Sequence, residues 1–195
     1  YTEIFKRSFL IIRRTRHDSE KMVSLSLLAD HWKIPHTDST VSIMTNVDKR
    51  LFMPLLKSKI LRAIDTVFWK KGDAWTHHDS FPLIAKPATG WHGEGIEVLR
   101  EKKDLTNFIQ EAKEDFLIQP LLNFENEYRV LVIGKTAVGA VEKIKQEGAI
   151  AANYRRGARF VKTTIPKKIL KECVRLCEEL GIDIGGVDLG RINRD

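Results

Sequence analysis

A lysine and three glycines lie between two short apolar runs near the middle of the chain. Lys86 ends the first run, and Gly90, Gly93 and Gly95 follow it with the spacing G-x-x-G-x-G. Glycines adopt positive φ angles and allow close backbone approach, so exposed N–H groups can face phosphate oxygens while the lysine adds a positive charge. The spacing is neither that of a P-loop nor that of a dinucleotide fingerprint. It predicts a hairpin loop that either covers an anion or serves only as a turn.

The charge of the chain favours an anionic partner. Its 195 residues contain 33 Lys and Arg against 26 Asp and Glu, for a formal net charge of +7. Because both signs are interspersed, this surplus does not distinguish a nucleotide from an acidic peptide or a nucleic acid. Nucleic acid is the least favoured of the three, because no basic stretch is interleaved with aromatic residues and no nucleic-acid motif is present.

The two cysteines and the apolar runs describe an ordinary globular protein. Cys173 and Cys177 share an apolar helical face with Leu176, which predicts core packing and neither a metal site nor a disulfide. No apolar run is long enough to span a membrane and no signal peptide is visible, so we expect a cytoplasmic protein without a membrane partner. The sequence begins at Tyr1, and we expect it to be part of a longer polypeptide.

Strand-like and helix-like patterns alternate along the chain. Strands are expected at 8–13, 64–69, 116–119, 128–133, 137–144 and 184–189, a hairpin at 81–99, and helices at 22–33, 49–60, 104–112 and 167–180. Asp48 and Lys49 are expected to open a helix, Asp104 to cap a helix at its N-terminus, and Gly181 to end the last helix. The stretch 34–45 is expected to be a connector. The mixture predicts an α/β or α+β fold.

Several motifs follow one another in a particular order. Asp48 and Lys49 open a predicted helix, LIAKPATGWHGEGI follows at 83–96, and FLIQPLL, ENEYRVLVIG, AVEKI, NYRRGA and GVDL come after it. This order resembles the ATP-grasp superfamily, and within it the RimK-like ligases, over essentially the whole chain. The resemblance implies two α+β subdomains that clasp ATP, at 46–115 and 116–195, preceded at 1–45 by the end of an N-terminal α/β domain.

The resemblance also implies an ATP site. Lys49 and Lys86 match the family's two phosphate-binding lysines, and the glycine hairpin matches its mobile lid, with Gly93 and Gly95 as nucleotide-binding positions. Glu127 matches the acidic residue that takes the ribose hydroxyls. Four further residues match the hinge whose backbone pairs with the adenine edge, namely Gln119, Pro120, Leu121 and Leu122.

The reaction implied by the resemblance is amide formation. A substrate carboxylate attacks the γ-phosphate of ATP to give an acylphosphate, and an amino acid amine then displaces phosphate. Arg129, Asn153 and Arg156 match residues that face the reacting groups, and Asp188 matches the first carboxylate for Mg²⁺ or Mn²⁺. Glutamate, an acidic peptide or an acidic carrier is the expected substrate class, and a homo-oligomer is left open.

Three departures from the family pattern leave an alternative open. Pro120 stands where the hinge often has glutamate, and Ala151 stands where some members have an ATP-contacting arginine. The chain also stops at Asp195, before the Glu-x-Asn strand that supplies the family's remaining metal ligands, which we interpret as truncation. A catalytically inactive ATP-binding module of the same fold is the alternative to a ligase.

Overall fold

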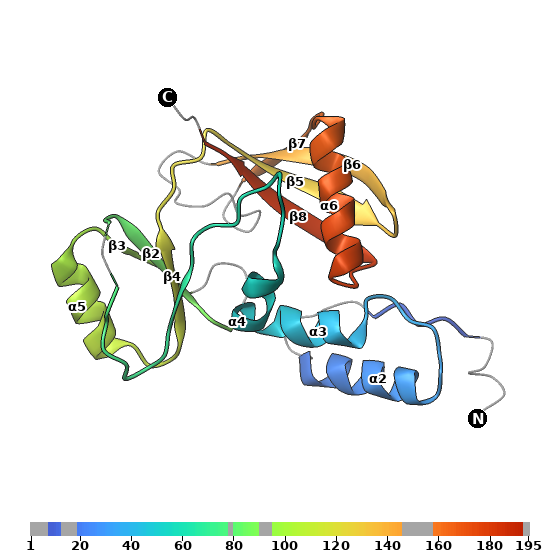
Figure 1. Cartoon of the computed structure of the whole chain (residues 1–195), viewed down its shortest axis with the longest axis horizontal. Helices are drawn as coiled ribbons and strands as arrows, with labels where there is room; N and C mark the ends of the chain where they lie inside the picture. The colour runs from blue at the N-terminus through green and yellow to red at the C-terminus, as the bar shows by residue number, and fades with distance from the viewer. Residues whose placement is uncertain (1–7, 13–18, 78–79, 90–94, 146–157, 193–195) are drawn as a thin grey trace.

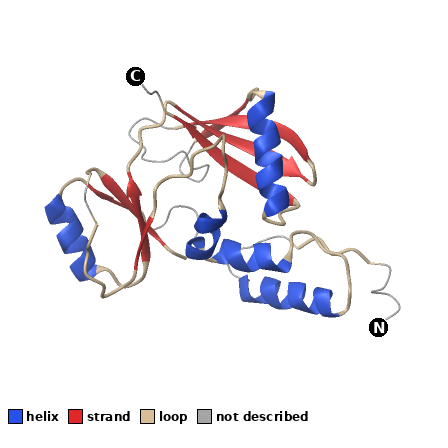
Figure 2. Ribbon diagram, viewed as in Figure 1, coloured by secondary structure: helices blue, strands red, loops and turns tan. Residues whose placement is uncertain are grey.

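The computed structural model describes residues 8–12, 19–77, 80–89, 95–145 and 158–192. Within them the chain forms two four-stranded antiparallel sheets and a group of helices near the N-terminal end (Figure 1). A helix covers one face of each sheet, and the N-terminal helices lie together beside the second sheet (Figure 2). This arrangement confirms the predicted mixture of helices and strands and its α+β class.

The first sheet is built around the predicted glycine hairpin, in the strand order β1-β4-β2-β3. Its strands are β1 at Val67–Trp69, β2 at Leu83–Pro87, β3 at Glu97–Leu99 and β4 at Phe116–Pro120. β2 and β3 pair with Leu83 opposite Leu99, which confirms the hairpin. Helix α5, Lys102–Glu111, packs Leu105 and Phe108 against the sheet, because these residues lie on one face of the helix.

The second sheet has the strand order β7-β6-β5-β8 and is covered by helix α6, Lys167–Glu179. Its strands are β5 at Asn126–Ile133, β6 at Thr136–Ile144, β7 at Arg159–Lys162 and β8 at Ile184–Arg191. Cys173 and Cys177 are buried, unbonded thiols between α6 and the sheet, which confirms that they are core residues. Burial raises the pKa of both thiols to about 11, so they stay protonated and unreactive at neutral pH.

The change from one sheet to the other falls after Pro120. β4 pairs with β1 and β2, so residues 116–120 lie in the first sheet, although the sequence placed them with the second subdomain. Strand pairing is non-local and is not visible in the apolar run itself. The division into subdomains stays a prediction, and the sheets favour a boundary between 120 and 126.

One helix among the described residues was not predicted. The N-terminal helices are α2 at Ser19–His31, α3 at Thr40–Val47, α4 at Lys49–Phe52 and the short 3₁₀-helix η1 at Met53–Leu55. The sequence predicted a connector at 34–45, but α3 begins inside it. Ser39 Oγ caps α3 by accepting a hydrogen bond of 3.1 Å from the Ser42 N–H, and Ile43 is only 1% exposed. The cap and this burial outweigh the weak helix propensity of its Thr, Val and Ser residues.

Three further expectations needed correction. The helix predicted over 49–60 ends at Leu55, because Pro54 interrupts the hydrogen-bond pattern. The N-cap of α5 is Glu101, while Asp104 lies in the first turn, where its carboxylate accepts a hydrogen bond of 2.8 Å from the Arg100 N–H. In place of a strand at 8–13, the described residues 8–12 form one isolated bridge, from Leu10.

Gly181 ends α6 as predicted and also allows the N-terminal helices to approach. Its φ is +65°, and the Ser39 N–H donates to its carbonyl at 2.7 Å. A Cβ at this position would lie 2.2 Å from Ser39 Oγ. Gly134, in the turn between β5 and β6, has a φ of +54° but open space around its Cα. The two glycines therefore share a backbone conformation and differ in their surroundings.

We expect Gly181→Ala to lower the free energy of unfolding more than Gly134→Ala does. Both substitutions strain the left-handed backbone by roughly 1–2 kcal/mol, but only Gly181→Ala also pushes Ser39 away. Urea unfolding of the two variants measures the difference. Equal losses would show that the contact between Gly181 and Ser39 is not tight.

Hydrogen bonds of Glu172 and Arg175 hold the loop after η1 against α6. Its carboxylate accepts hydrogen bonds from Ser58 Oγ and from Arg175 Nε, the latter at 3.0 Å. Arg175 Nη2 also donates to the carbonyl of Lys57 at 2.7 Å. The hydrogen bonds from Arg175 and Ser58 lower the pKa of Glu172 from 4.5 to about 2. The loop between η1 and β1 is thereby fixed to helix α6, which covers the second sheet.

We expect the contribution of Glu172 to stability to depend on pH. Because the folded-state pKa lies below the unfolded one, the contribution is complete above about pH 4.5 and is lost as the pH falls toward about 2. Unfolding free energies of the wild type and of Glu172→Gln, measured from pH 7 to pH 3, should differ most at neutral pH and converge below pH 4.5. A constant difference over this range would contradict the assignment.

Candidate active site

Two lysines meet at the end of β2. Lys49, the first residue of α4, donates from its backbone N–H to the Ala88 carbonyl at 3.1 Å and from Nζ to the Pro87 carbonyl at 3.0 Å. Burial lowers the pKa of Lys49. Burial also lowers the pKa of Lys86, the charge of Lys49 lowers it further, and Glu127 acts in the opposite direction. Two partly desolvated ammonium groups that repel each other favour a bound anion.

Arg50 holds the start of α4, and with it Lys49, against the first sheet. Its guanidinium donates from Nε to Asp48 at 3.0 Å and from Nη1 to Asp115. Asp48 in turn caps α4 by accepting from the Arg50 N–H at 2.9 Å, at the helix start that the sequence predicted. Asp115 also accepts at 3.0 Å from the N–H of Lys71, in the turn after β1. The position of Lys49 is therefore set by contacts from three separate segments.

One backbone N–H of the predicted hinge, residues 119–122, already makes a hydrogen bond within the protein. Leu121 donates to the Pro82 carbonyl at 2.9 Å, so its N–H faces β2. Because successive residues of an extended chain face opposite edges, the Pro120 carbonyl and the Leu122 N–H face the other edge. On that edge β1 begins at Val67, opposite Ile118, and does not extend alongside residues 120–122. Pro120 and Leu122 are thus the predicted hinge residues that can present an acceptor and a donor to a ligand.

A row of alternating charges crosses the second sheet. Arg129 and Asp188 are directly opposite each other on β5 and β8, and the guanidinium makes two hydrogen bonds to the carboxylate, of 2.8 and 2.7 Å. Lys143 on β6 lies 3.3 Å from Asp188 and 3.5 Å from Glu127, and Lys145 lies 2.7 Å from Glu127. Each carboxylate is therefore placed between two cations.

These contacts shift the pKa values of Asp188 and Arg129. Burial acts to raise the pKa of Asp188, but the hydrogen bonds from Arg129 and the charge of Lys143 outweigh it, so the pKa falls below its ordinary value. The hydrogen bonds to Asp188 raise the pKa of Arg129. Gly186 leaves room for this pair, because a Cβ there would lie 3.1 Å from Arg129 Cδ. Both partners are about half exposed, at 46% and 49%, so they stay accessible to a ligand.

Charged residues of the two sheets lie within electrostatic range of one another. The charge of Glu127, in the second sheet, acts on Lys86, in the first. Seven charged residues belong to this group: Lys49, Lys86, Glu127, Arg129, Lys143, Lys145 and Asp188. Five of these side chains are cationic and two are anionic, a surplus that suits a polyphosphate or an acidic substrate.

A sequence profile of the RimK-like ATP-grasp domain matches residues 19–195. The chain belongs to the RimK-like ATP-grasp family. A probable alpha-L-glutamate ligase from Cellvibrio japonicus is 27% identical over 118 residues, which are 58% of this chain and 39% of that protein. A probable alpha-L-glutamate ligase from Haemophilus influenzae is 32% identical over 120 residues, with the same two coverages, 58% and 39%. The chain thus spans about two fifths of the length of these relatives.

Solved structures agree with the RimK-like ATP-grasp assignment at the level of the fold. D-alanine–D-alanine ligase from Bacillus anthracis, complexed with ATP, is 14% identical with a TM-score of 0.74, over 98% of this chain and 66% of that one. The ATP-grasp ligase PsnB, complexed with a minimal precursor, is 20% identical with a TM-score of 0.63, over 90% of this chain and 57% of that one. These likenesses confirm the predicted ATP-grasp fold.

In this RimK-like chain Asp188 is the predicted carboxylate ligand for a metal ion. No group of three or more His, Cys, Asp or Glu side chains suited to a metal occurs among them. Magnesium in nucleotide sites commonly takes one or two carboxylates and completes its shell with phosphate oxygens and water. Asp188 fits that role, since a carboxylate with two hydrogen bonds from Arg129 keeps further lone pairs.

Several predicted site residues of the RimK-like pattern lie outside the described part of the chain, namely Gly93, Asn153 and Arg156. Gly95 is described and has a φ of +68°, and a Cβ there would lie 2.8 Å from Pro87 Cγ. Glycine at this position is therefore required by packing at the root of the hairpin.

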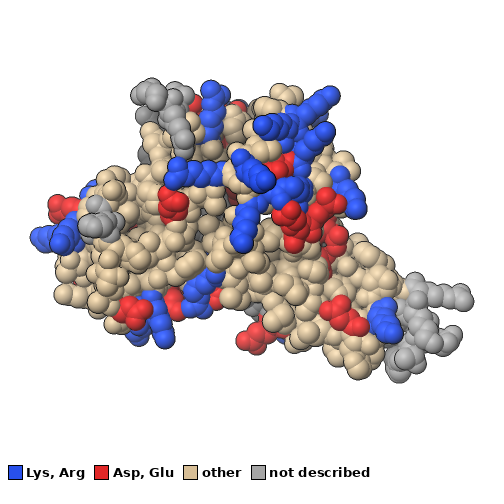
Figure 3. Space-filling model, in the orientation of Figure 1, with Lys and Arg blue, Asp and Glu red and all other residues tan. Residues whose placement is uncertain are grey.

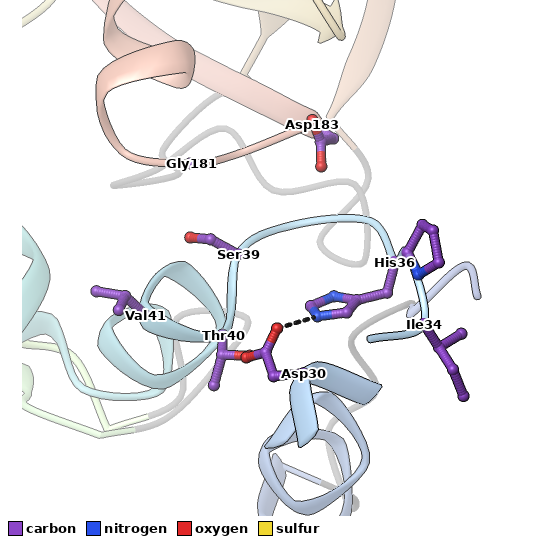
Figure 4. Close-up of a pocket in the computed structure, with 9 residues that line it drawn as sticks. Asp30, Ile34, His36, Ser39, Thr40, Val41, Gly181 and Asp183 are labelled. Atoms are coloured by element: carbon purple, nitrogen blue, oxygen red, sulfur yellow. Dashed lines mark hydrogen bonds and ion pairs between the residues drawn. The ribbon is translucent and has the colours of Figure 1, made fainter. Parts of the chain in front are cut away.

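A surface groove lies apart from the candidate site. It is lined by α2, the start of α3 and the loop before β8, with Asp30 Oδ1 and His36 Nε2 3.1 Å apart (Figure 4). None of the predicted site residues lines it.

Among the described helices, none combines the length and the apolar character needed to cross a membrane.

Proposed function

We propose that this chain carries the ATP site and reaction centre of an ATP-dependent ligase that joins an amino acid amine to a carboxylate. The observation that carries the proposal is the row of charges on the second sheet, where Arg129 makes two hydrogen bonds to Asp188 and Lys143 lies 3.3 Å from Asp188 and 3.5 Å from Glu127. A polyphosphate placed there meets Lys49 and Lys86 from one sheet and Lys143 and Arg129 from the other. Family membership and the likeness to ATP-grasp ligases support the same site.

The nucleotide would be held by groups of both sheets. Lys49 and Lys86 bind its phosphates, Glu127 accepts from the ribose hydroxyls, and the Pro120 carbonyl and Leu122 N–H meet the adenine edge. Gln119 and Leu121, the other two hinge residues, contact Lys86 of β2 and the Pro82 carbonyl just before β2. Gly93 and Gly95 belong to the loop over the phosphates. A magnesium ion bound at Asp188 would supply further positive charge beside the phosphates.

The reaction would proceed in two displacements. A carboxylate oxygen attacks the γ-phosphorus, the bond to the bridging oxygen breaks, and ADP leaves with an acylphosphate formed. The amine nitrogen then attacks the acyl carbon, inorganic phosphate leaves, and the nitrogen loses a proton. Neither step uses a side-chain nucleophile, so the protein acts by positioning and by charge, through Arg129, Asn153, Arg156 and the lysines.

Glutamate is the substrate we favour for the amine, and an acidic peptide or carrier for the carboxylate. Relatives named probable alpha-L-glutamate ligases and a neighbour bound to a precursor peptide support this choice. The net charge of +7 and the cations around the second sheet also favour acidic substrates (Figure 3).

A screen of ADP release tests the proposal. The full-length protein is given ATP, magnesium and each of the twenty amino acids, with and without an oligoglutamate peptide as carboxylate. We expect ADP release to depend on one or a few amino acids, glutamate first. Binding of ATP without amino-acid-dependent ADP release would favour the inactive ATP-binding module instead.

A further inference from the structure

Three hydrogen bonds in series connect Lys86 to the segment before β1. Lys86 Nζ donates to Gln119 Oε1 at 2.8 Å, and Gln119 Nε2 donates to Thr66 Oγ1 at 2.7 Å. The Thr66 hydroxyl then donates to the Ile64 carbonyl at 2.8 Å. Gln119 is only 5% exposed, so water competes little for its amide. The series runs from β2 across β4 to the chain that enters β1.

The ammonium group of Lys86 fixes which atom donates and which accepts in each of the three hydrogen bonds. An ammonium group only donates, so Lys86 requires the oxygen of the Gln119 amide and turns its NH₂ group toward Thr66. The Thr66 oxygen must then accept, and its one proton goes to the Ile64 carbonyl. A reversed amide would place two donors against each other at Lys86. Lys86 and Thr66 therefore require the same amide orientation, with the oxygen toward Lys86 and the NH₂ group toward Thr66.

We infer that Thr66 is a positioning residue for Lys86, which it holds in place for phosphate through the side chain of Gln119. Lys86 is repelled by Lys49 and partly desolvated, so the Gln119 oxygen is a contact that keeps the ammonium at the end of β2. Without the Thr66 hydroxyl, the buried NH₂ group loses its acceptor, and the amide gains by turning toward another partner. The role in catalysis rests on the proposed function, whereas the role in placing Lys86 does not.

Substitutions at Thr66 separate the hydroxyl from the volume of the side chain. Thr66→Val keeps the shape and removes the hydroxyl, and Thr66→Ser keeps the hydroxyl. Thr66→Ala serves in the same way as Thr66→Val if the valine variant does not fold. Thr106→Val is the matched control, because Thr106 Oγ1 donates to the Lys102 carbonyl at 2.9 Å on the exposed side of α5, away from the site.

Two readouts are needed. The first is the rate at which an acetylating reagent modifies Lys86 in the protein without nucleotide, measured by peptide mass spectrometry. The second is the KM for ATP and the kcat of the full-length protein. We expect Thr66→Val to raise the modification rate and the KM for ATP by about fivefold each, the effect of one lost hydrogen bond. Thr66→Ser and Thr106→Val should stay within about twofold of the wild type.

The readouts separate this inference from the proposed function. An unchanged modification rate in Thr66→Val, or equal changes in Thr66→Ser and Thr66→Val, would overturn the role of Thr66. If modification of Lys86 responds as expected while the wild type neither binds nor turns over ATP, the positioning role stands and the proposed function fails.

Discussion

Replacing Lys86 with methionine is expected to lower kcat by at least ~100-fold, by analogy with the loss of one preorganised donor at a developing charge. The ammonium is preplaced by Gln119 at 2.8 Å and is partly buried, so its charge acts on a phosphate in surroundings with little water. Single-turnover ADP formation by the full-length protein measures the effect on chemistry, and the melting temperature measures the effect on the fold.

The expected stability of Lys86→Met is a separate test of the site. Burial lowers the pKa of Lys86, so its charge is costly in the protein without a ligand, but the substitution also leaves the buried Gln119 oxygen without its donor. Because these two effects oppose each other, the variant should melt close to the wild-type temperature. Lys162→Met, at an exposed position of β7, is the matched control and should leave turnover unchanged. Turnover by Lys86→Met close to that of the wild type would remove Lys86 from the site.

Breaking the pair of Arg129 and Asp188 is the second substitution with a large expected effect. We expect Arg129→Met and Asp188→Asn each to lower kcat by roughly 100-fold, because both groups act on the reacting phosphate in the proposed site. Arg129→Lys should not restore the activity, since an ammonium cannot make the two parallel hydrogen bonds of 2.8 and 2.7 Å. The kcat of the double variant, Arg129→Met with Asp188→Asn, should be little lower than that of either single variant.

An exposed pair of the same type provides the control for Arg129. Arg62 and Asp65 lie 2.9 Å apart with side chains 69% and 78% exposed. Arg62→Met should change neither turnover nor stability measurably, as expected of an isolated surface ion pair. If Arg129→Met behaved in the same way, the pair with Asp188 would be a surface contact without a part in the reaction.

Local patterns were sufficient to predict most elements. The hairpin at 81–99, the strands β5 and β8 and the end of α6 at Gly181 all follow from apolar runs and turn residues. Helix α3 was missed because its stability comes from the Ser39 cap and the burial of Ile43, while its own residues have weak helix propensity.

The partners of the site residues were harder to predict, because they depend on register. The turn at Gly134 and Lys135 alone would place Glu142 opposite Glu127. A register shift between Leu131 and Val132 instead places Lys143 there. Lys143, Lys145 and the connection from Lys86 to Thr66 therefore emerge only from the structure, although Lys86, Glu127, Arg129 and Asp188 were predicted from the family resemblance.

The transfer of a labelled oxygen tests the central claim most directly. The carboxylate substrate identified by the screen is enriched with ¹⁸O in its carboxyl group and incubated with ATP, magnesium, the amine and the full-length protein. If the carboxylate attacks the γ-phosphorus, each inorganic phosphate released carries one ¹⁸O atom, in proportion to the amide formed. Unlabelled phosphate, released while amide accumulates, would contradict the acylphosphate and with it the proposed reaction.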